Sequence, residues 1–126
     1  MIIGIGTDIL DINRLRRCPE DLLPDAPFLI KTYTAAERAA AEERPDKIAY
    51  LATRFAGKEA VFKALGIGGD RIRLNEIEIL NDGDGRPQVT LTGRMKELAD
   101  RCGVLEVKLS LSYENDYAIA FAIMQK

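Results

Sequence analysis

The 126-residue sequence contains no histidine. This absence removes the commonest general base in enzymes and the commonest nitrogen ligand for metal ions. Acid–base chemistry would therefore have to come from Asp, Glu, Lys, Tyr, Cys or water. A metal ion would have to be held by oxygen atoms, which favours magnesium, manganese or calcium.

Cysteines are few, and long apolar runs are missing. Cys18 and Cys102 form no disulfide framework and their spacing matches no metal-binding motif, so both are interpreted as reduced packing residues. No apolar run approaches the roughly 20 residues that a membrane-spanning helix needs. The N-terminal residues MIIGIGTDILDI contain neither the basic segment nor the cleavage site of a signal peptide. We expect a cytoplasmic protein without membrane contact.

Length and composition indicate one globular domain that spans residues 1–126. Hydrophobic residues make up 47% and charged residues 30%, which excludes a largely disordered chain. The net charge of −2 predicts no general affinity for nucleic acid or anionic membranes. Basic residues cluster locally instead, with Arg14, Arg16 and Arg17 near the N-terminus and Lys47, Arg54, Lys58 and Lys63 further along the chain. For any single one of them, a solvated helix face is the simplest interpretation.

Local patterns predict an α+β fold in which antiparallel hairpins pack on a long central helix. The segment T-A-A-E, which begins at Thr34, is a capping box that predicts a helix to about Arg44. A longer helix is predicted from Pro45 to Leu65, where Gly66 ends it. Short helices are predicted at 11–17 and 94–102, a loop at 19–27, and strands at 2–10, 71–80, 88–93, 104–113 and 117–124.

The first predicted strand carries glycines on one of its faces. Alternation of side chains places Gly4, Gly6 and Asp8 on that face. The two glycines leave room for another backbone or a ligand to approach closely. Asp8 ends this strand, and its simplest role is an N-cap of the helix that follows, with Asp11 three residues on.

Glu59 has an unexpected position on the predicted long helix. An apolar stripe runs along this helix through Ile48, Ala52, Phe55, Glu59 and Phe62, and such a face is typically buried. Burying an unpaired carboxylate costs several kcal/mol, so Glu59 must be paired, bound to a metal, or at the edge of a cleft. An i,i+4 pair with Lys63 would contribute only roughly 0.2–0.5 kcal/mol, which is too little to offset burial.

Asp8 and Glu59, beside glycines and a row of cations, together indicate a magnesium-dependent site that handles phosphate groups. The segment G-I-G-G at residues 66–69 offers backbone amides for an anion, although such a glycine cluster is more often a turn. Residue spacing alone does not identify the substrate.

Two long motifs carry a resemblance to a known family. The segments G-I-G-T-D-I-x-x-I-x-R-L at residues 4–15 and R-F-A-x-K-E-A-x-x-K-A-L-G at residues 54–66 resemble the holo-acyl-carrier-protein synthase family of phosphopantetheinyl transferases. The total length and the closing hairpin are also similar, so the resemblance spans nearly the whole chain. It implies transfer of the 4′-phosphopantetheine group from coenzyme A to a serine of apo-acyl carrier protein, with release of adenosine 3′,5′-bisphosphate, in fatty acid biosynthesis. The alternative is a non-catalytic module that binds coenzyme A or a nucleotide on the same fold.

The resemblance also implies roles for individual residues. Asp8 and Glu59 would bind Mg²⁺, and Lys63 would stabilise or protonate the leaving phosphate. Coenzyme A would be held by Arg54, with Lys47 and the Gly66–Gly68 turn. The acidic carrier protein would dock on Arg14, and Arg17 would share the same helix face.

The resemblance further implies a homotrimer with active sites between subunits, in which Asp8 comes from one chain and Glu59 from its neighbour. The strongly apolar segments 104–113 and 117–124 agree with such an assembly, because a monomer would leave their faces or edges exposed. Tyr113 occupies a place where the family often carries histidine, so a mechanism that needs a histidine base there cannot operate.

Overall fold

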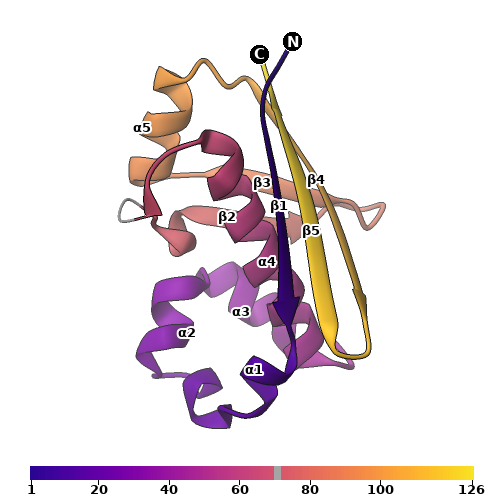
Figure 1. Ribbon diagram of the computed structural model, residues 1–126. Coiled ribbons are helices and arrows are strands. Elements are labelled where there is room, and N and C mark those ends of the chain that lie inside the picture. Colours follow the sequence, from indigo (N-terminus) through magenta and orange to yellow (C-terminus); the bar gives the residue numbers. More distant parts are fainter. Residues whose placement is uncertain (70–71) are drawn as a thin grey trace.

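The computed structural model describes residues 1–69 and 72–126 (Figure 1). Its helices and strands are β1 Ile2–Asp11, α1 Asn13–Arg16, α2 Pro27–Thr32, α3 Ala35–Glu42, α4 Lys47–Leu65, β2 Ile77–Asn81, β3 Pro87–Leu91, α5 Gly93–Arg101, β4 Glu106–Glu114 and β5 Tyr117–Gln125. Three antiparallel strands form one sheet in the order β1–β5–β4, and β2 and β3 form a separate hairpin. The mixture of helices with antiparallel strands, arranged around the long helix α4, confirms the predicted α+β fold.

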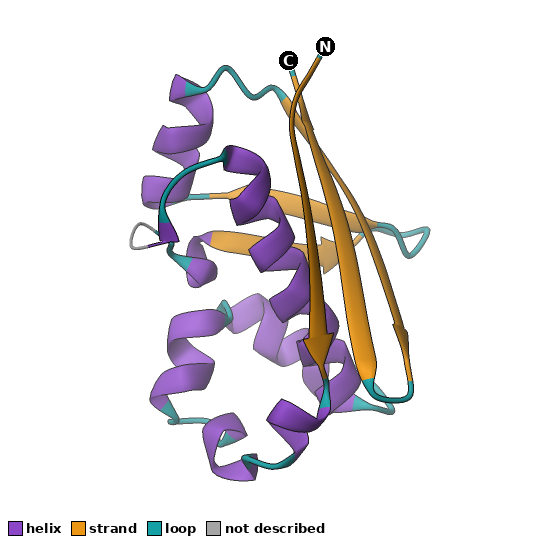
Figure 2. Ribbon diagram, in the orientation of Figure 1, coloured by secondary structure: helices purple, strands orange, loops and turns teal. Residues whose placement is uncertain are grey.

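Helix α4 packs closely against β1 and β5 of the three-stranded sheet (Figure 2). Gly4 and Gly6 of β1 face the helix backbone. A Cβ atom at Gly4 would lie 2.0 Å from the carbonyl oxygen of Ala64, and one at Gly6 would lie 2.0 Å from that of Ala60. Any larger side chain would push the helix off the sheet. The close approach predicted from the two glycines is therefore confirmed, and the approaching group is the backbone of α4.

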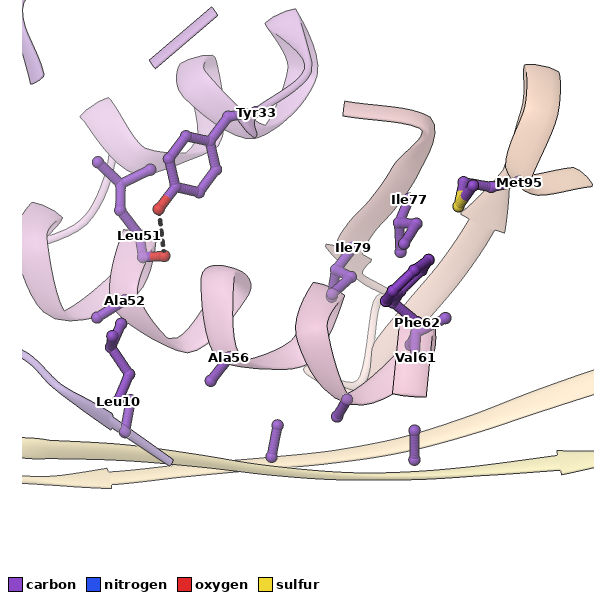
Figure 3. Packing of buried hydrophobic residues seen from close by; sticks show 14 of the residues in the cluster. Leu10, Tyr33, Leu51, Ala52, Ala56, Val61, Phe62, Ile77, Ile79 and Met95 are labelled. Atoms are coloured by element: carbon purple, nitrogen blue, oxygen red, sulfur yellow. Dashed lines mark hydrogen bonds between the residues drawn. The ribbon is translucent and has the colours of Figure 1, made fainter. Parts of the chain in front are cut away.

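The remaining sides of α4 are covered as well, so this helix forms the centre of the hydrophobic core. Figure 3 shows its buried residues packed against side chains from the neighbouring elements. Fully buried members of this core include Leu51, Ala52, Ala56 and Val61 of α4, Ile77 and Ile79 of β2, and Met95 of α5. The buried Tyr33 closes one end, where its hydroxyl donates a 2.7 Å hydrogen bond to the carbonyl oxygen of Leu51. A helix surrounded in this way is buried on nearly every face.

The capping box at the start of α3 is confirmed, and it belongs to a buried ion pair. The Glu37 carboxylate accepts hydrogen bonds from the backbone N–H of Thr34 at 2.9 Å and of Ile79 at 2.8 Å. It also accepts one from the Lys58 ammonium at 2.7 Å, and both charged side chains are 0% exposed. Lys58 donates further to the carbonyl oxygens of Leu74 and Ile77. The interpretation of Lys58 as part of a solvated helix face is wrong.

Several predicted elements differ from the structure in their bounds. The segment predicted as a loop at 19–27 contains a 3-10 turn, Pro19–Leu22, and α2 then begins at Pro27, which suits the first helical position because it needs no N–H partner. The strand predicted at 71–80 begins only at Ile77, because Leu74–Glu76 form another 3-10 turn. Residue 71 of that prediction lies outside the described residues, as does residue 70.

Three smaller predictions have clear outcomes. Cys18 is partly buried, as expected of a packing residue, whereas Cys102 is exposed; neither is in a disulfide. Helix α4 begins at Lys47 with Asp46 as its N-cap, two residues after the predicted start. Within residues 1–69 and 72–126, no helix has the length and apolar character that crossing a membrane would require.

Candidate active site

Asp8 and Lys63 lie together at the edge where β1 meets α4. Lys63 donates from Nζ to the Asp8 carboxylate at 3.1 Å and to the backbone carbonyl of Thr7 at 3.1 Å. Glu59 lies one turn before Lys63 on α4, close enough for the Asp8 charge to affect its pKa. The structure therefore brings all three predicted catalytic residues together, and it does so within a single chain. The expectation that Asp8 and Glu59 come from different chains is wrong.

Asp8 is inside its strand, and it does not cap a helix. Strand β1 continues to Asp11, and α1 begins only at Asn13. The Asp11 carboxylate instead binds the start of α1, because it accepts a 3.0 Å hydrogen bond from the backbone N–H of Asn13. Capping is therefore ruled out as the role of Asp8, whose side chain is directed toward α4 and is only 15% exposed.

The stripe on α4 that contains Glu59 is not the buried face that its apolar residues suggest. Since α4 is covered on its other sides, the positions that remain partly open are Lys47, Ile48, Phe55, Glu59 and the exposed Lys63. Ala52 and Phe62, which the predicted stripe also contained, are buried. Glu59 is therefore half-buried beside Asp8, where this stripe of the helix is partly open. The i,i+4 pair does not form, because Lys63 pairs with Asp8 instead.

The electrostatics around Glu59 disfavour its charged form. Partial burial raises the pKa of Glu59, the neighbouring Asp8 carboxylate raises it further, and Lys63 opposes both effects. Two carboxylates held side by side are stabilised by a cation between them.

The residue types fit a magnesium ion whose remaining ligands come from a substrate. Mg²⁺ commonly binds one or two protein carboxylates and completes its coordination with water and phosphate oxygens. Among the described residues, no group of three or more candidate ligand side chains gathers to form a closed metal site. Asp8 and Glu59 therefore match an open site that is completed by phosphate groups, and do not match a site built from protein ligands alone.

A second group of polar residues lines a pocket of about 340 Å³ beside the start of α4. Its lining includes Arg44, Tyr50, Arg54, Asn81 and Tyr113. Arg54 is only 5% exposed; its guanidinium donates to Asn81 Oδ1 at 2.6 Å and lies 3.9 Å from the centre of the Tyr50 ring. Burial lowers the pKa of Arg54. The description of Arg54 as a solvated charge is wrong, although its place in a pocket agrees with a ligand-binding role.

The two groups lie on opposite sides of α4. Arg54 and Lys63 are nine positions apart, which at about 3.6 residues per turn is about two and a half turns of helix. Lys63 contacts Asp8 of β1, whereas Arg54 contacts Asn81 of β2. The structure thus does not bring Arg54 together with Asp8, Glu59 and Lys63 in one chain.

The other residues predicted to hold coenzyme A lie in neither group. Lys47 pairs with Glu42 and lines a separate hollow beside α2 and α3. Gly66 ends α4 in the left-handed conformation with φ of 72°, and its backbone N–H is bonded to the carbonyl of Lys63. Gly68 is exposed in the loop that follows. The glycine turn thus acts as the end of the helix, next to Lys63.

Arg44, Tyr50 and Asn81 are pocket residues that the sequence interpretation missed. The i,i+4 spacing of Tyr50 and Arg54 on a helix is a signal that could have identified the tyrosine. Asn81 comes from β2 and is close to Arg54 only through the fold, so no local pattern marks it.

The basic residues near the N-terminus have different environments. Arg14 lines an apolar hollow of about 230 Å³ with Leu10, Phe28 and Phe55, and Phe55 lies one turn before Glu59 on α4. Arg16 is bonded within the chain, to Asp116 at 3.3 Å and to the carbonyl of Asn115 at 3.0 Å. Arg17 is the exposed C-cap residue of α1.

Comparison with known proteins places this arrangement in one class. The family model of the 4′-phosphopantetheinyl transferase superfamily matches residues 4–122. The chain belongs to this superfamily. Within it, the chain is similar to the holo-[acyl-carrier-protein] synthase of Desulforudis audaxviator, with 43% identity over 123 residues that cover 98% of this chain and 92% of the relative. The enzyme of the same name from Moorella thermoacetica is 42% identical over 124 residues, or 98% and 94% of the two chains.

Solved structures give the same result. The holo-[acyl-carrier-protein] synthase of Neisseria meningitidis superposes with a TM-score of 0.86 at 33% identity and covers 100% of both chains. The Helicobacter pylori synthase, solved in complex with coenzyme A, has a TM-score of 0.81 at 28% identity and covers 96% of this chain and 99% of its own. The resemblance inferred from the two sequence motifs is confirmed.

Proposed function

We infer that this chain transfers the 4′-phosphopantetheine group from coenzyme A to a serine of apo-acyl carrier protein and releases adenosine 3′,5′-bisphosphate. The observation that carries this inference is the grouping of Asp8, Glu59 and Lys63 at the junction of β1 and α4. We propose that residues 1–126 act as one domain, in the cytoplasm, in the service of fatty acid biosynthesis. The alternative of a non-catalytic binding module is not favoured, because it would give no use to two adjacent carboxylates whose charges repel.

We propose that Asp8 and Glu59 hold Mg²⁺, which would neutralise charge on the pyrophosphate of coenzyme A as the phosphorus–oxygen bond breaks. Lys63 is the nearest ammonium and would donate to the leaving phosphate. Its present hydrogen bond to Asp8 is solvent-accessible, so exchanging that partner for a phosphate costs little. Phosphoryl transfer draws most of its catalysis from positioning and charge stabilisation, so a chain without histidine needs no dedicated base.

We propose a homotrimer in which each active site lies between two chains. The support is that the Arg54 pocket and the Asp8–Glu59–Lys63 group lie on opposite sides of α4, so one coenzyme A would contact them from two different chains. The outer face of the three-stranded sheet supplies an apolar surface for such contacts, since Ile5, Ile9, Ile119 and Phe121 are 61%, 65%, 48% and 43% exposed there. Several large exposed apolar side chains on one face are typical of a protein interface.

This assembly predicts which pairs of inactive variants restore each other. A mixture of Asp8→Ala and Glu59→Ala chains should stay inactive after subunit exchange, because both residues belong to the same chain and no site would contain both. A mixture of Asp8→Ala with Arg44→Ala should regain activity, because one kind of mixed site combines the intact Asp8 of one chain with the intact Arg44 of its neighbour. The activity of each mixture is compared with the summed activities of its two variants, each assayed alone. Recovery in the first mixture, or none in the second, would contradict the proposed arrangement.

We propose that the carrier protein docks on Arg14 and Arg17, with the apolar hollow beside Arg14 as part of the contact. Arg14→Ala should weaken carrier-protein binding by up to about fivefold at low salt, since an exposed ion pair contributes at most about 1 kcal/mol. The loss should shrink at high salt. Affinity for coenzyme A should not change. Arg101→Ala on α5 removes the same charge from an exposed position near the opposite end of the molecule and serves as the control. An equal effect of both substitutions would show that only net charge matters.

The direct test of the function is the release of adenosine 3′,5′-bisphosphate from coenzyme A in the presence of Mg²⁺ and apo-acyl carrier protein. Chromatography of the nucleotides should show release that requires all three components. Binding of coenzyme A without any release, with several apo-carrier proteins, would instead support the non-catalytic module.

A further inference from the structure

Helix α1 depends on its neighbours for its orientation, because it is a single turn of four residues. Isolated helices this short are unstable in water, since few backbone bonds offset the cost of ordering the chain. Leu15 anchors one side of α1 in the hydrophobic core. The exposed residues Arg14 and Arg17 belong to the same turn and its C-cap. Their direction therefore depends on how the polar side of α1 is held.

The turn between β4 and β5 holds the polar side of α1 (Figure 1). The backbone N–H of Ile12 donates to the Asp116 carbonyl at 2.7 Å. The Asp116 carboxylate accepts from Asn13 Nδ2 at 3.1 Å and from Arg16 Nη1 at 3.3 Å. Arg16 also donates from Nη2 to the carbonyl of Asn115 at 3.0 Å and from Nη1 to Asn13 Oδ1 at 3.0 Å. One carboxylate thus joins both ends of the short helix to the hairpin.

The three arginines of this segment have different surroundings. Arg16 is directed toward the hairpin and is bonded there, whereas Arg14 and Arg17 are exposed. On the basis of the proposed function and its docking surface, we propose that Asp116 is a positioning residue for the carrier protein. Its carboxylate fixes Asn13 and Arg16, which sets the direction in which Arg14 and Arg17 face the acidic partner.

A direct electrostatic role of Asp116 would have the opposite effect on binding. Asp116 is an anion beside a basic surface that is proposed to bind an acidic protein. If the carboxylate acted only through its charge, its removal would strengthen binding, because like charges repel. If it acts by positioning, its removal weakens binding, because the carrier protein must then order α1 as it binds. The direction of the change separates the two roles.

The effect should be local to α1. The side chains of Arg16 and Asp116 are 36% and 58% exposed, and exposed ion pairs contribute little to the stability of a whole domain. They can nevertheless decide whether a single turn at the surface is ordered, since such turns open more easily than the core. Loss of the Asp116 carboxylate should therefore loosen α1 and leave the melting temperature close to that of the wild type.

The test is the variant Asp116→Ala, which removes the carboxylate and keeps the backbone bond to Ile12. Its KM for apo-acyl carrier protein should rise about two- to tenfold, the range for immobilising one more flexible side chain on binding. Its kcat at saturating carrier protein and its KM for coenzyme A should equal those of the wild type. Hydrogen exchange at the amides of Arg16 and Arg17 should be faster, because these N–H groups form the backbone bonds of α1.

Two further variants serve as controls. Asp116→Asn keeps an oxygen that can accept from Asn13 and Arg16, so its KM for the carrier protein should stay close to that of the wild type although the charge is lost. Asp100→Ala on α5 breaks an exposed 2.8 Å ion pair with Lys96 and should change neither KM.

An unchanged or lower carrier-protein KM in Asp116→Ala would overturn the proposal, as would an equal rise in Asp100→Ala. A rise in Asp116→Asn as large as that in Asp116→Ala would show that the accepting oxygen does not matter, and would overturn it too. The same holds for a lower kcat or an equal rise in the KM for coenzyme A, because the effect would then not be confined to docking. If the wild type transferred no phosphopantetheine, the proposed function itself would fail, and that result is seen without any variant.

Discussion

Replacing Glu59 with glutamine is expected to reduce the rate of phosphopantetheine transfer by at least about 100-fold. The substitution keeps the shape of the side chain but removes one of the two carboxylates proposed to hold Mg²⁺. Charge stabilisation by a catalytic metal ion contributes several kcal/mol, and about 2.7 kcal/mol corresponds to 100-fold in rate. Asp8→Asn should have an effect of similar size. Turnover is measured at saturating Mg²⁺, coenzyme A and carrier protein.

The same variant should be at least as stable as the wild type. Burial and the Asp8 carboxylate both raise the pKa of Glu59, which means that the folded chain disfavours the charged form of this side chain. The neutral amide of glutamine removes this unfavourable charge. The melting temperature of Glu59→Gln in Mg²⁺-free buffer at pH 7 should therefore not be lower than that of the wild type. Tyr113→Phe is a control that should retain most activity, because a phenol hydroxyl is a poor general base and its removal leaves Asp8, Glu59 and Lys63 in place. A Glu59→Gln enzyme with more than a tenth of normal activity would show that this carboxylate is not catalytic.

Replacing Lys58 with methionine is expected to lower the free energy of unfolding by about 3–5 kcal/mol, because the Glu37 carboxylate would be left buried without its cation. Methionine fills most of the space of the lysine side chain, so the loss reports on charge more than on volume. Globular domains are stable by only about 5–15 kcal/mol, so the variant would lose a large share of its stability. Denaturant titration of wild type and variant measures the difference.

The double variant Glu37→Gln/Lys58→Met separates charge from packing. It removes the isolated carboxylate but keeps an oxygen that can accept from the backbone N–H groups of Thr34 and Ile79. Its loss of stability should be smaller than the sum of the two single losses, since the two residues interact directly. Non-additive losses are expected because the two side chains are in contact at 2.7 Å. Additive losses would show that Glu37 and Lys58 contribute to stability independently, and would contradict this account.

Local signals in the sequence predicted much of the fold. The capping box that begins at Thr34 and the glycine that ends α4 each act through neighbours within a few residues, and each is present. The surroundings of α4 were not predictable in this way. Its stripe through Phe55 and Glu59 suggested one buried face, whereas the sheet, the hairpin and α3 bury the other faces and leave this stripe partly open. Lys58 is buried because its partner Glu37 and two backbone carbonyls come from distant parts of the chain.

The candidate site likewise contains residues that the sequence predicted and residues that only the fold brings together. Asp8, Glu59 and Lys63 were identified because they belong to two motifs, and the fold brings these motifs together. Their arrangement within one chain was not predicted, because it depends on β1 packing directly on α4. The Arg54 pocket was predicted only in part, since Arg44 and Tyr50 belong to no motif and gather there through the packing at the start of α4.

Intact-mass spectrometry of apo-acyl carrier protein after incubation with this chain, coenzyme A and Mg²⁺ tests the proposed function most directly. The carrier protein should gain the mass of one phosphopantetheine group, and a carrier protein with alanine in place of its acceptor serine should gain nothing. The gain should disappear when Mg²⁺ is chelated and return when it is restored. An unchanged carrier-protein mass, with a folded enzyme that binds coenzyme A, would contradict the assignment of this chain as a phosphopantetheinyl transferase.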